Sequence, residues 1–367
     1  MKRLLCIVTN MNTGGAETFL MKIYRQLDRT KYQMDFCICN QNHNFYEDEI
    51  RQLGGVIYHL PIKSKHPISF YWKLYRLIQQ KHYTYVLRLG STIYQAFDLY
   101  IACLAGAKIR AFRSCNANAK LSPWLIILHK LLRKIIMKIV NVKIAPSDLA
   151  GQFAFGAGMD TIFINNGLDT SLFRFSAQLR QEYRTQFNMN NQLVIGHIGR
   201  FNDEQKNHLF LIDIFHEIVK KHPSSILCLV GTGARECILR DYVKELHLDS
   251  YVKFLGQRND IAQLLNAFDI FVFPSLFEGM PNTVIEAQTN GVPCLISNTI
   301  TKQVGITDWV YFMSLKESAK KWAEKALTVS QNHSINERSQ GATKMCQCSY
   351  DSKQVVKHFE KYIFQKK

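Results

Sequence analysis

Short apolar runs alternate with amphipathic stretches along nearly the whole chain of 367 residues. An apolar run bounded by polar or glycine residues is typical of a buried strand, and an amphipathic stretch of helical period is typical of a surface helix. In the first half the pattern predicts strands at residues 4–9, 33–39, 56–60, 85–89, 109–114, 142–145 and 161–165. Helices are predicted between most of these strands, for example at residues 16–27, 68–80 and 93–104.

The second half repeats this alternation. It predicts strands at residues 193–198, 225–230, 252–255, 270–274 and 293–297, and helices at residues 209–221, 237–246, 260–267 and 281–289. Strands that alternate with helices form parallel sheets with crossover connections. The polar stretch 180–192 between the two series is predicted to be a linker.

The predicted fold is therefore α/β, with two Rossmann-like, doubly wound domains that face each other across a cleft. We place the first domain at residues 1–180 and the second at residues 190–349. The terminal stretch 350–365 is predicted to be helical and to pack back on the first domain. Ligands bind at the carboxyl ends of the strands in such sheets, so the loops that follow the strands are the candidate sites.

Composition narrows the class of protein. Hydrophobic residues make up 47% of the chain, enough for a sizeable core, yet no uncharged apolar run is long enough for a spanning helix. The apolar run at the N-terminus is too short for a signal peptide. Ten cysteines are scattered without a Cys-x-x-Cys motif, which fits a reducing, cytoplasmic compartment.

The net charge of +17 is unevenly distributed. Residues 1–168 contain 22 Lys and Arg against 9 Asp and Glu, and residues 169–367 contain 24 against 20. A strongly basic half is compatible with nucleic acid, an anionic membrane surface or a phosphorylated substrate. No nucleic-acid recognition motif occurs, so the other two partners are favoured.

Two carboxylates, Glu278 and Glu286, bracket seven residues directly after the predicted strand 270–274. Pro281 is suited to the first position of a helix, where no amide hydrogen bond is lost. This places Glu278 in a loop at the carboxyl edge of the sheet and Glu286 more than a turn into the helix. Carboxylates that hold hydroxyl groups, beside helix-start amides that hold phosphate, suit a nucleotide-sugar.

Further candidate residues follow other predicted strands. Arg200 comes directly after the strand 193–198, and Lys206 precedes the next helix, so both could neutralise a diphosphate. Gly15 opens the first predicted helix, and Gly231 follows the strand 225–230. These glycines would let backbone amides approach phosphate, although plain tight turns explain them equally well.

On these residues the chain resembles glycosyltransferase family 4, of the GT-B architecture, and especially its bacterial capsule and exopolysaccharide branch. The resemblance spans nearly the whole chain and is denser in the second half. Its matching segments are residues 14–18 (GGAET), 195–200 (IGHIGR), 206–208 (KNH), 229–233 (LVGTG), 274–279 (PSLFEG) and 286–288 (EAQ).

The resemblance implies a role for each matching residue. Glu286 would bind the ribose hydroxyls of the donor, and Glu278 a hydroxyl of the transferred sugar, with Arg200 and Lys206 on the diphosphate. The amides of residues 279–282 (Gly279, Met280, Pro281 and Asn282) would complete the phosphate site, with Gly231 beside them and Gly15 supplying an amide from the other domain. Family members retain anomeric configuration and need no metal or other cofactor, and the chain contains no Asp-x-Asp motif.

The first half departs from the family pattern. Arg113 and Cys115 stand where relatives carry histidines, and Arg88 lies in another segment that usually bears one. Arg113 and Asn116 remain candidates for the acceptor side, but an arginine cannot act as a general base near neutral pH. Residues 124–138 interleave basic and apolar side chains, which predicts either a membrane-docking helix or an ordinary crossover helix with a solvated basic side.

The sequence thus predicts a retaining hexosyltransferase of surface polysaccharide synthesis. Its donor would be a nucleoside diphosphate sugar, with UDP favoured over GDP, and its acceptor a lipid-pyrophosphate-linked saccharide or an oligosaccharide. We expect the enzyme in the cytoplasm, peripherally bound to the anionic inner face of the membrane, with no nucleic-acid partner. The alternative is a catalytically impaired GT-B binding or scaffold subunit, because of the missing histidines. A GT-B epimerase and a dehydrogenase fit the motifs less well.

Overall fold

The structure of this chain is a computed structural model that describes residues 1–12, 14–40, 42–90, 92–115, 133, 136–278 and 280–365. The chain forms two compact units. The first unit comprises Met1–Gly167 together with Ser352–Lys367, and the second comprises Leu168–Asp351. The boundary thus lies before residues 180–192, and the end of the chain belongs to the first unit.

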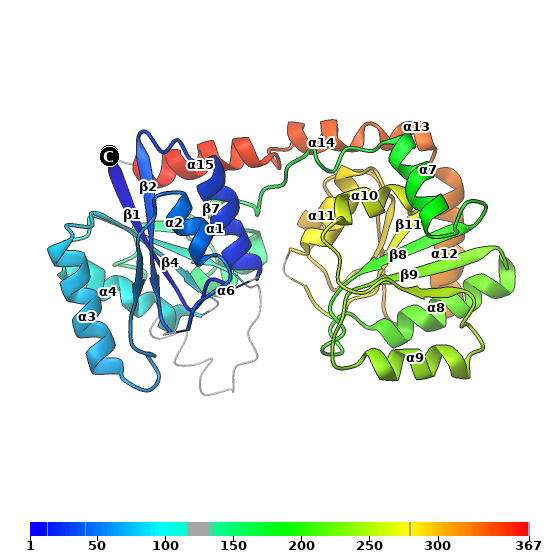
Figure 1. The fold of residues 1–367 in the computed structure, drawn as a ribbon, viewed down its shortest axis with the longest axis horizontal. Helices are drawn as coiled ribbons and strands as arrows, with labels where there is room; N and C mark the ends of the chain where they lie inside the picture. The colour runs from blue at the N-terminus through cyan, green and yellow to red at the C-terminus, as the bar shows by residue number, and fades with distance from the viewer. Residues whose placement is uncertain are drawn as a thin grey trace. The chain divides into compact units, whose positions relative to one another are not determined.

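The first unit contains a seven-stranded sheet in which every pairing is parallel, with the order β3-β2-β1-β4-β5-β6-β7 (Figure 1). The strands are β1 (Lys2–Val8), β2 (Tyr32–Ile38), β3 (Ile57–His59), β4 (Tyr85–Gly90), β5 (Ile109–Ser114), β6 (Val142–Ala145) and β7 (Ile162–Phe163). The direction of winding reverses between β1 and β4, as in a doubly wound sheet. This agrees with the predicted fold class.

Helices cover both faces of this sheet. They are α1 (Gly15–Gln26), α2 (Glu47–Gln52), α3 (Pro67–Gln80), η1 (Ile93–Ala96), α4 (Phe97–Leu104), α6 (Asp148–Phe155) and α15 (Ser352–Phe364). Side chains of β1 alternate between two cores, as the pleat of a strand requires. Leu4 and Cys6 pack in the core that includes α1 and α15, whereas Leu5 and Ile7 pack in the core that includes α3, α4 and α6.

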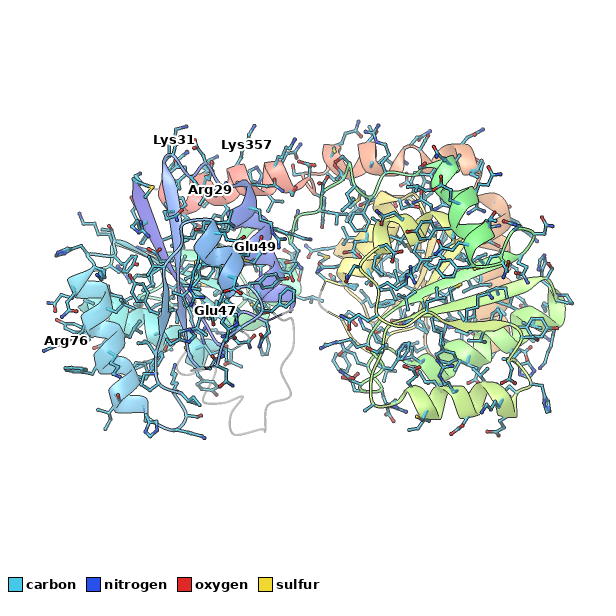
Figure 2. All side chains as sticks on the ribbon, viewed as in Figure 1. Arg29, Lys31, Glu47, Glu49, Arg76 and Lys357 are labelled. Carbon is cyan, nitrogen blue, oxygen red and sulfur yellow. The ribbon has the colours of Figure 1, made fainter. Side chains whose placement is uncertain are left out.

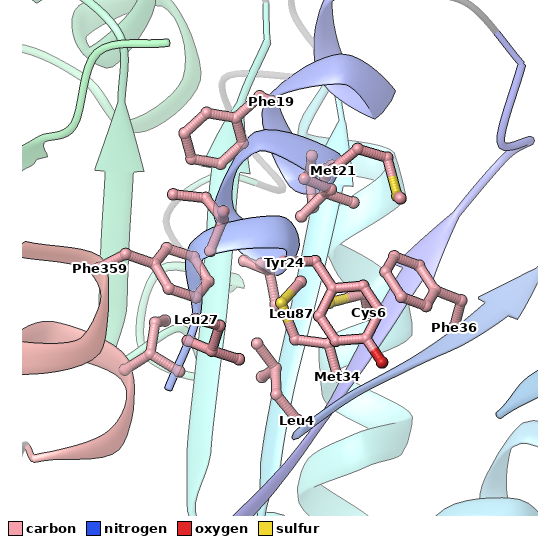
Figure 3. Close-up of a cluster of buried hydrophobic side chains, with 14 of the residues drawn as sticks. Leu4, Cys6, Phe19, Met21, Tyr24, Leu27, Met34, Phe36, Leu87 and Phe359 are labelled. Atoms are coloured by element: carbon pink, nitrogen blue, oxygen red, sulfur yellow. The ribbon is translucent and has the colours of Figure 1, made fainter. Parts of the chain in front are cut away.

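The last helix, α15, is part of the first unit through a buried aromatic contact. Phe359 is fully buried, and its ring lies 6.3 Å from that of Phe19 on α1 (Figure 3). At the start of the helix, Gln26 donates a 2.8 Å hydrogen bond to the hydroxyl of Ser352. The chain therefore begins and ends in the same unit.

Many basic side chains of the first unit lie on its surface. Arg29, Lys31 and Lys357 are exposed (Figure 2), and Lys31 forms an ion pair with Asp28. The backbone amide of Asp28 also contacts the carboxylate of Glu360 on α15. Some of the basic side chains that give the first unit its positive charge are thus exposed to solvent.

The second unit contains a six-stranded parallel sheet with the order β10-β9-β8-β11-β12-β13. The strands are β8 (Leu193–Ile198), β9 (Ser225–Val230), β10 (Val252–Phe254), β11 (Ile270–Phe273), β12 (Cys294–Ser297) and β13 (Val310–Met313). The helical segments are α7 (Ala177–Gln186), α8 (His208–Lys221), α9 (Glu236–Glu245), α10 (Ile261–Leu264), η2 (Leu265–Ala267), α11 (Asn282–Thr289), η3 (Lys302–Val304), α12 (Ala319–Asn332), α13 (Ile335–Arg338) and α14 (Gly341–Gln347). The winding reverses between β8 and β11.

Several elements of the second unit differ from the sequence prediction, among them α7, β13 and the start of α11, and helices α12, α13 and α14 were not predicted either. The prediction of a linker at residues 180–192 is wrong for residues 180–186, because these belong to helix α7. Arg180 and Arg184 of this helix both form ion pairs with Asp269. Strand β13 was not predicted. Pro281 caps α11 instead of opening it, with φ −70° and ψ 115°, so the helix begins at Asn282.

Within the part of the chain that the structure describes, no helix combines the length and apolarity needed to cross a membrane.

We expect Phe359→Ala to lower the free energy of unfolding of the first unit by about 3–5 kcal/mol, because it removes a buried aromatic ring and leaves a cavity. Urea unfolding followed by intrinsic fluorescence measures this loss. The adjacent exposed residue supplies a matched control, since His358→Ala should leave the unfolding midpoint unchanged. Equal midpoints for the two variants would show that α15 does not stabilise this unit.

Candidate active site

The loops that follow β8 and β11 meet at the carboxyl edge of the second sheet. The two strands are neighbours, with Ile195 opposite Ile270 and Gly196 opposite Phe271. They are adjacent because the winding reverses between them, which is where ligands bind in open α/β sheets. The first loop carries Arg200 and Lys206, and the second carries Glu278.

Lys206 and Glu278 form an ion pair at this edge. The Lys206 Nζ atom lies 2.6 Å from Glu278 Oε1, and the exposed fractions of the two side chains are only 18% and 12%. The ammonium group also lies 4.6 Å from the centroid of the Phe273 ring. The sequence analysis assigned these residues to one site, and the structure brings them into direct contact.

Two residues that the sequence analysis missed hold this pair in place. The side-chain amide of Gln205 donates a 3.1 Å hydrogen bond to Glu278 Oε1, and the Ser275 hydroxyl, whose single proton is shared with the Gln205 carbonyl, lies 3.1 Å from the same oxygen. The carbonyl of Gln205 in turn accepts hydrogen bonds from the Ser275 hydroxyl at 2.7 Å and from the Leu276 amide at 2.8 Å. Ser275 lies within the matching segment 274–279, which could have indicated it, whereas Gln205 was marked only by its place directly before Lys206.

The other predicted cation, Arg200, is exposed, and no described residue forms a hydrogen bond or ion pair with its guanidinium group. It follows Gly199 at the end of β8, on the same loop as Lys206. One cation of the loop is therefore fixed by a carboxylate, whereas the other extends from the surface.

The predicted glycine Gly231 is required by the close approach of two loops. Its φ of +145° lies outside the range that other residues favour, and a Cβ atom at this position would lie 2.0 Å from the Gly199 carbonyl oxygen. The neighbouring amides are paired, since Gly199 N donates to Val230 O and Gly231 N donates to Gly256 O, each at 2.9 Å. The glycine lets the loops after β8 and β9 pack against each other.

Helix α11 begins immediately after the loop that carries Glu278. Met280 is partly buried, Pro281 is buried at the cap, and Asn282 is the first helical residue. Glu286 lies one turn farther along the helix and is partly buried. The fourth predicted residue of the loop, Gly279, lies outside the described residues. An α-helix start of this kind presents amide groups and the positive end of the helix dipole.

One polar group near this helix start lacks a partner. The hydroxyl oxygen of Thr283, in the first turn of α11, is buried and forms no hydrogen bond with a described residue. Leaving a buried hydroxyl unpaired costs free energy.

Two buried histidines lie beneath the loop after β8. The rings of His197 and His208 are 4.8 Å apart, and His197 Nδ1 lies 2.9 Å from the carbonyl oxygen of Val272. Burial lowers the pKa of both imidazoles, to about 4 for His208, with further lowering by the nearby charge of Lys206. Both rings are therefore neutral at physiological pH, and the cationic character of this loop comes from its Lys and Arg side chains.

The candidates of the first unit are placed differently. Gly15 is the first residue of α1 and is exposed, with open space where a Cβ atom would stand. Arg113 is 1% exposed, donates a 2.6 Å hydrogen bond to Asn166, and lies 3.7 Å from the centroid of the Phe19 ring. The structure thus places Arg113 in the interior of the first unit. Asn116, and residues 124–138 apart from 133 and 136–138, lie outside the described residues.

Among the described residues, no group of three or more His, Cys, Asp or Glu side chains is arranged to hold a metal ion. Of the charged residues at the carboxyl edge of the second sheet, Arg200, Lys206 and Glu278 are those assigned to the site, and the loop after β8 also carries Asp203 and Glu204, the second of which pairs with Arg235. A site of two cations and one carboxylate can bind an anionic group together with a hydroxyl group.

Two family models match successive parts of the chain. Residues 13–172 match the model described as glycosyltransferase family 4, and residues 192–332 match the one described as glycosyl transferases group 1. These ranges correspond to the greater part of the first unit and of the second unit, respectively.

Two bacterial relatives match most of the chain. EpsF of Bacillus subtilis, named as a glycosyltransferase, is 33% identical over 332 residues, which is 88% of this chain and 86% of EpsF. The capsular polysaccharide biosynthesis glycosyltransferase CapH of Staphylococcus aureus is 25% identical over 315 residues, which is 81% of this chain and 82% of CapH.

Solved structures share the fold. HepE of Anabaena in complex with UDP-glucose superimposes with a TM-score of 0.75 at 20% identity, and covers 98% of this chain and 99% of its own. A glycosyltransferase from Rickettsia africae gives a TM-score of 0.83 at 15% identity, with 100% and 99% of the two chains covered. Together with the family models and EpsF, these similarities show that the chain belongs to glycosyltransferase family 4, has the GT-B fold and is a glycosyltransferase of polysaccharide biosynthesis.

Proposed function

We propose that this glycosyltransferase moves a hexose-type sugar from a UDP-sugar to a hydroxyl group of a lipid-linked saccharide, with retention of anomeric configuration. The observation that carries the proposal is the Lys206–Glu278 pair at the carboxyl edge of β8 and β11, directly before the start of α11. This arrangement places a cation, a carboxylate and helix-start amides within one short region of the second unit.

The leaving group of this reaction is a nucleoside diphosphate, and negative charge grows on it as the sugar–phosphate bond breaks. Lys206 and Arg200 stabilise that charge, assisted by the amides at the start of α11. Fixed charges of this kind in a water-poor site contribute several kcal/mol to catalysis. Glu278 accepts a hydrogen bond from a hydroxyl of the transferred sugar, and Glu286 binds the ribose.

Retention follows if the acceptor hydroxyl attacks from the face that the diphosphate leaves. The departing phosphate oxygen then accepts the proton of that hydroxyl, so no protein base is needed. This mechanism agrees with the buried, partnered state of Arg113, which cannot accept a proton near neutral pH. The cations of the second unit take the place that a divalent metal has in other sugar transferases.

The choice of donor and acceptor is supported by a third relative. An Escherichia coli enzyme named UDP-Gal:alpha-D-GlcNAc-diphosphoundecaprenol alpha-1,3-galactosyltransferase is 39% identical over 111 residues, which is 29% of this chain and 28% of that enzyme. HepE, whose structures contain UDP and UDP-glucose, has the same fold. A UDP-sugar donor and a lipid-pyrophosphate-linked acceptor are therefore the substrates that we propose.

A lipid-linked acceptor places the reaction at a membrane surface. The net charge of +17 and the strong excess of Lys and Arg in residues 1–168 favour peripheral binding to the anionic inner face of that membrane. Electrostatic binding of this kind weakens when salt screens the charges.

We expect Lys206→Ala to lower sugar transfer on the order of 10²-fold or more, because the diphosphate loses its fixed counter-charge. Diphosphate release from a panel of UDP- and GDP-sugars measures the effect and also identifies the donor. Lys221→Ala is a matched control, since Lys221 forms a 2.6 Å ion pair with Glu324 on the exposed surface of the same unit. Normal turnover by purified Lys206→Ala would refute the proposed role.

We expect Glu278→Gln to separate binding of the sugar from binding of the diphosphate. Removing the carboxylate frees Lys206, so the affinity for UDP alone should be unchanged or higher. Transfer from the UDP-sugar should fall by about 10-fold to 100-fold, the usual cost of a lost charge-assisted hydrogen bond. Calorimetric titration with UDP and a turnover assay give the two values. A variant that loses UDP affinity and keeps turnover would contradict this assignment.

Sedimentation with vesicles tests membrane binding. We expect the protein to bind phosphatidylglycerol vesicles at low salt, to remain in solution with phosphatidylcholine vesicles, and to be released from phosphatidylglycerol by about 0.5 M salt, where screening is strong. Equal partitioning into both kinds of vesicle would exclude an electrostatic mechanism.

A further inference from the structure

The first unit contains a large cavity whose lining includes none of the residues assigned above to the donor. Its volume is about 1010 Å³, the upper end of the usual size for a ligand pocket. Its lining includes Thr9 directly after β1, Cys39 directly after β2 and Arg88 near the end of β4. The cavity thus lies at the carboxyl edge of the first sheet, beside the point where the winding reverses between β1 and β4.

The walls of the cavity are mainly apolar and aromatic. Ile62, Tyr71, Phe97 and Ile139 supply much of this surface, and the rings of Tyr71 and Phe97 lie 5.2 Å apart. Two cations, Lys63 and Arg88, also line it, whereas none of its described lining residues is acidic. Such a lining suits a ligand that is apolar over most of its length and carries negative charge at one place.

The two cations share a single buried carboxylate. Asp98 is fully buried, and its oxygens lie 2.6 Å from Lys63 Nζ and 2.8 Å from Arg88 Nε. Arg88 is 3% exposed and also donates a 2.9 Å hydrogen bond to the carbonyl of Ile7, so it is held rigidly. Among the described residues, the two cations and the one carboxylate that they share leave an excess of one positive charge at the cavity.

Exposed apolar side chains surround the outer end of the cavity. Ile62, Phe97 and Tyr100 line the cavity and are each more than a third exposed. Pro67 lines both the cavity and an adjoining shallow hollow, to which Ile68 and Trp72 of α3 belong.

Ile68 is 86% exposed and Trp72 is 55% exposed, one turn apart on α3. Basic residues flank them, namely Lys65, Lys73 and Arg76. The guanidinium carbon of Arg76 lies 4.4 Å from the centroid of the Trp72 ring. Exposed Trp and Ile interleaved with Lys and Arg are typical of a surface that contacts an anionic bilayer. A lipid could therefore pass from the bilayer into the cavity.

The geometry points to a binding site for a polyprenyl-type lipid phosphate, with its phosphate on Lys63 near the fixed charge of Arg88 and its first isoprene units against the apolar walls. This inference rests on the proposed function for one premise, that the acceptor is lipid-linked. A saccharide alone would leave the apolar walls without a partner, and a nucleotide would find no carboxylate in the described lining for its ribose hydroxyls.

Equilibrium dialysis of the full chain with farnesyl phosphate, farnesol and inorganic phosphate, below their aggregation concentrations, tests the site directly. We expect farnesyl phosphate to bind at least about tenfold more tightly than farnesol, and inorganic phosphate to bind weakly, because both parts of the ligand contribute. Lys63→Gln should remove the preference for the phosphate, and Ile62→Asp should weaken both lipid probes about tenfold or more, because it places a charge against an apolar ligand.

Two exposed residues provide matched controls. Lys73→Gln on α3 and Ile238→Asp on α9 make the same chemical changes outside the cavity, and both should bind farnesyl phosphate as the unmodified chain does. If Lys63→Gln and Ile62→Asp bind farnesyl phosphate with the same affinity as the two control variants, the proposed lipid site is wrong. Tighter binding of dihexanoyl phosphatidic acid than of farnesyl phosphate would overturn the assignment to a polyprenyl lipid.

The dialysis requires no sugar transfer, so it separates this inference from the proposed reaction. If the lipid site is absent, farnesyl phosphate binding fails, whereas UDP-sugar hydrolysis remains and is still sensitive to Lys206→Ala. If instead the transfer proposal fails, Lys206→Ala has no effect on turnover and lipid binding is unchanged.

Discussion

The candidate site depends on one geometric constraint, namely that neighbouring parallel strands end at the same edge of a sheet. Residues 199–207 and 274–278 are far apart in sequence, yet they meet because β8 and β11 are paired. Lys206 and Glu278 then form an ion pair that little solvent reaches, and such a pair is favourable only when further hydrogen bonds compensate for lost hydration. Ser275 and Gln205 supply these bonds, so the pair and the two loops hold each other in place.

The loop after β8 is also held in place by two buried histidines and by the loop after β9. Neutral histidines fill the space beneath it without adding charge, and Gly231 lets the loop after β9 approach Gly199. A larger residue at Gly231 would push these backbones apart and disturb the position of Lys206. Packing and electrostatics are therefore coupled here, because the charges are useful only while the backbone that carries them is fixed.

The first unit uses its buried charges in another way. Arg113 is enclosed by Asn166 and Phe19, and Arg88 by Asp98 and the backbone of β1, so both arginines are interior groups. Of the described cations that line the cavity, Lys63, which shares Asp98, is the one with appreciable exposure. This distribution explains why the first half can be strongly basic while its sheet edge has largely apolar walls. Most of the excess charge lies on the surface, where water screens it.

The sequence by itself determined the α/β class, most strands to within a residue or two, and the chemical types at the site, because these depend on local periodicity and composition. It did not determine α7, since the polar surface of this helix hides its contacts with Asp269, which is distant in sequence. Nor could it reveal that Arg113 is buried, that Gln205 and Ser275 brace Glu278, or that Lys63 and Arg88 share Asp98. Those facts depend on which strands become neighbours, and only the tertiary structure decides that.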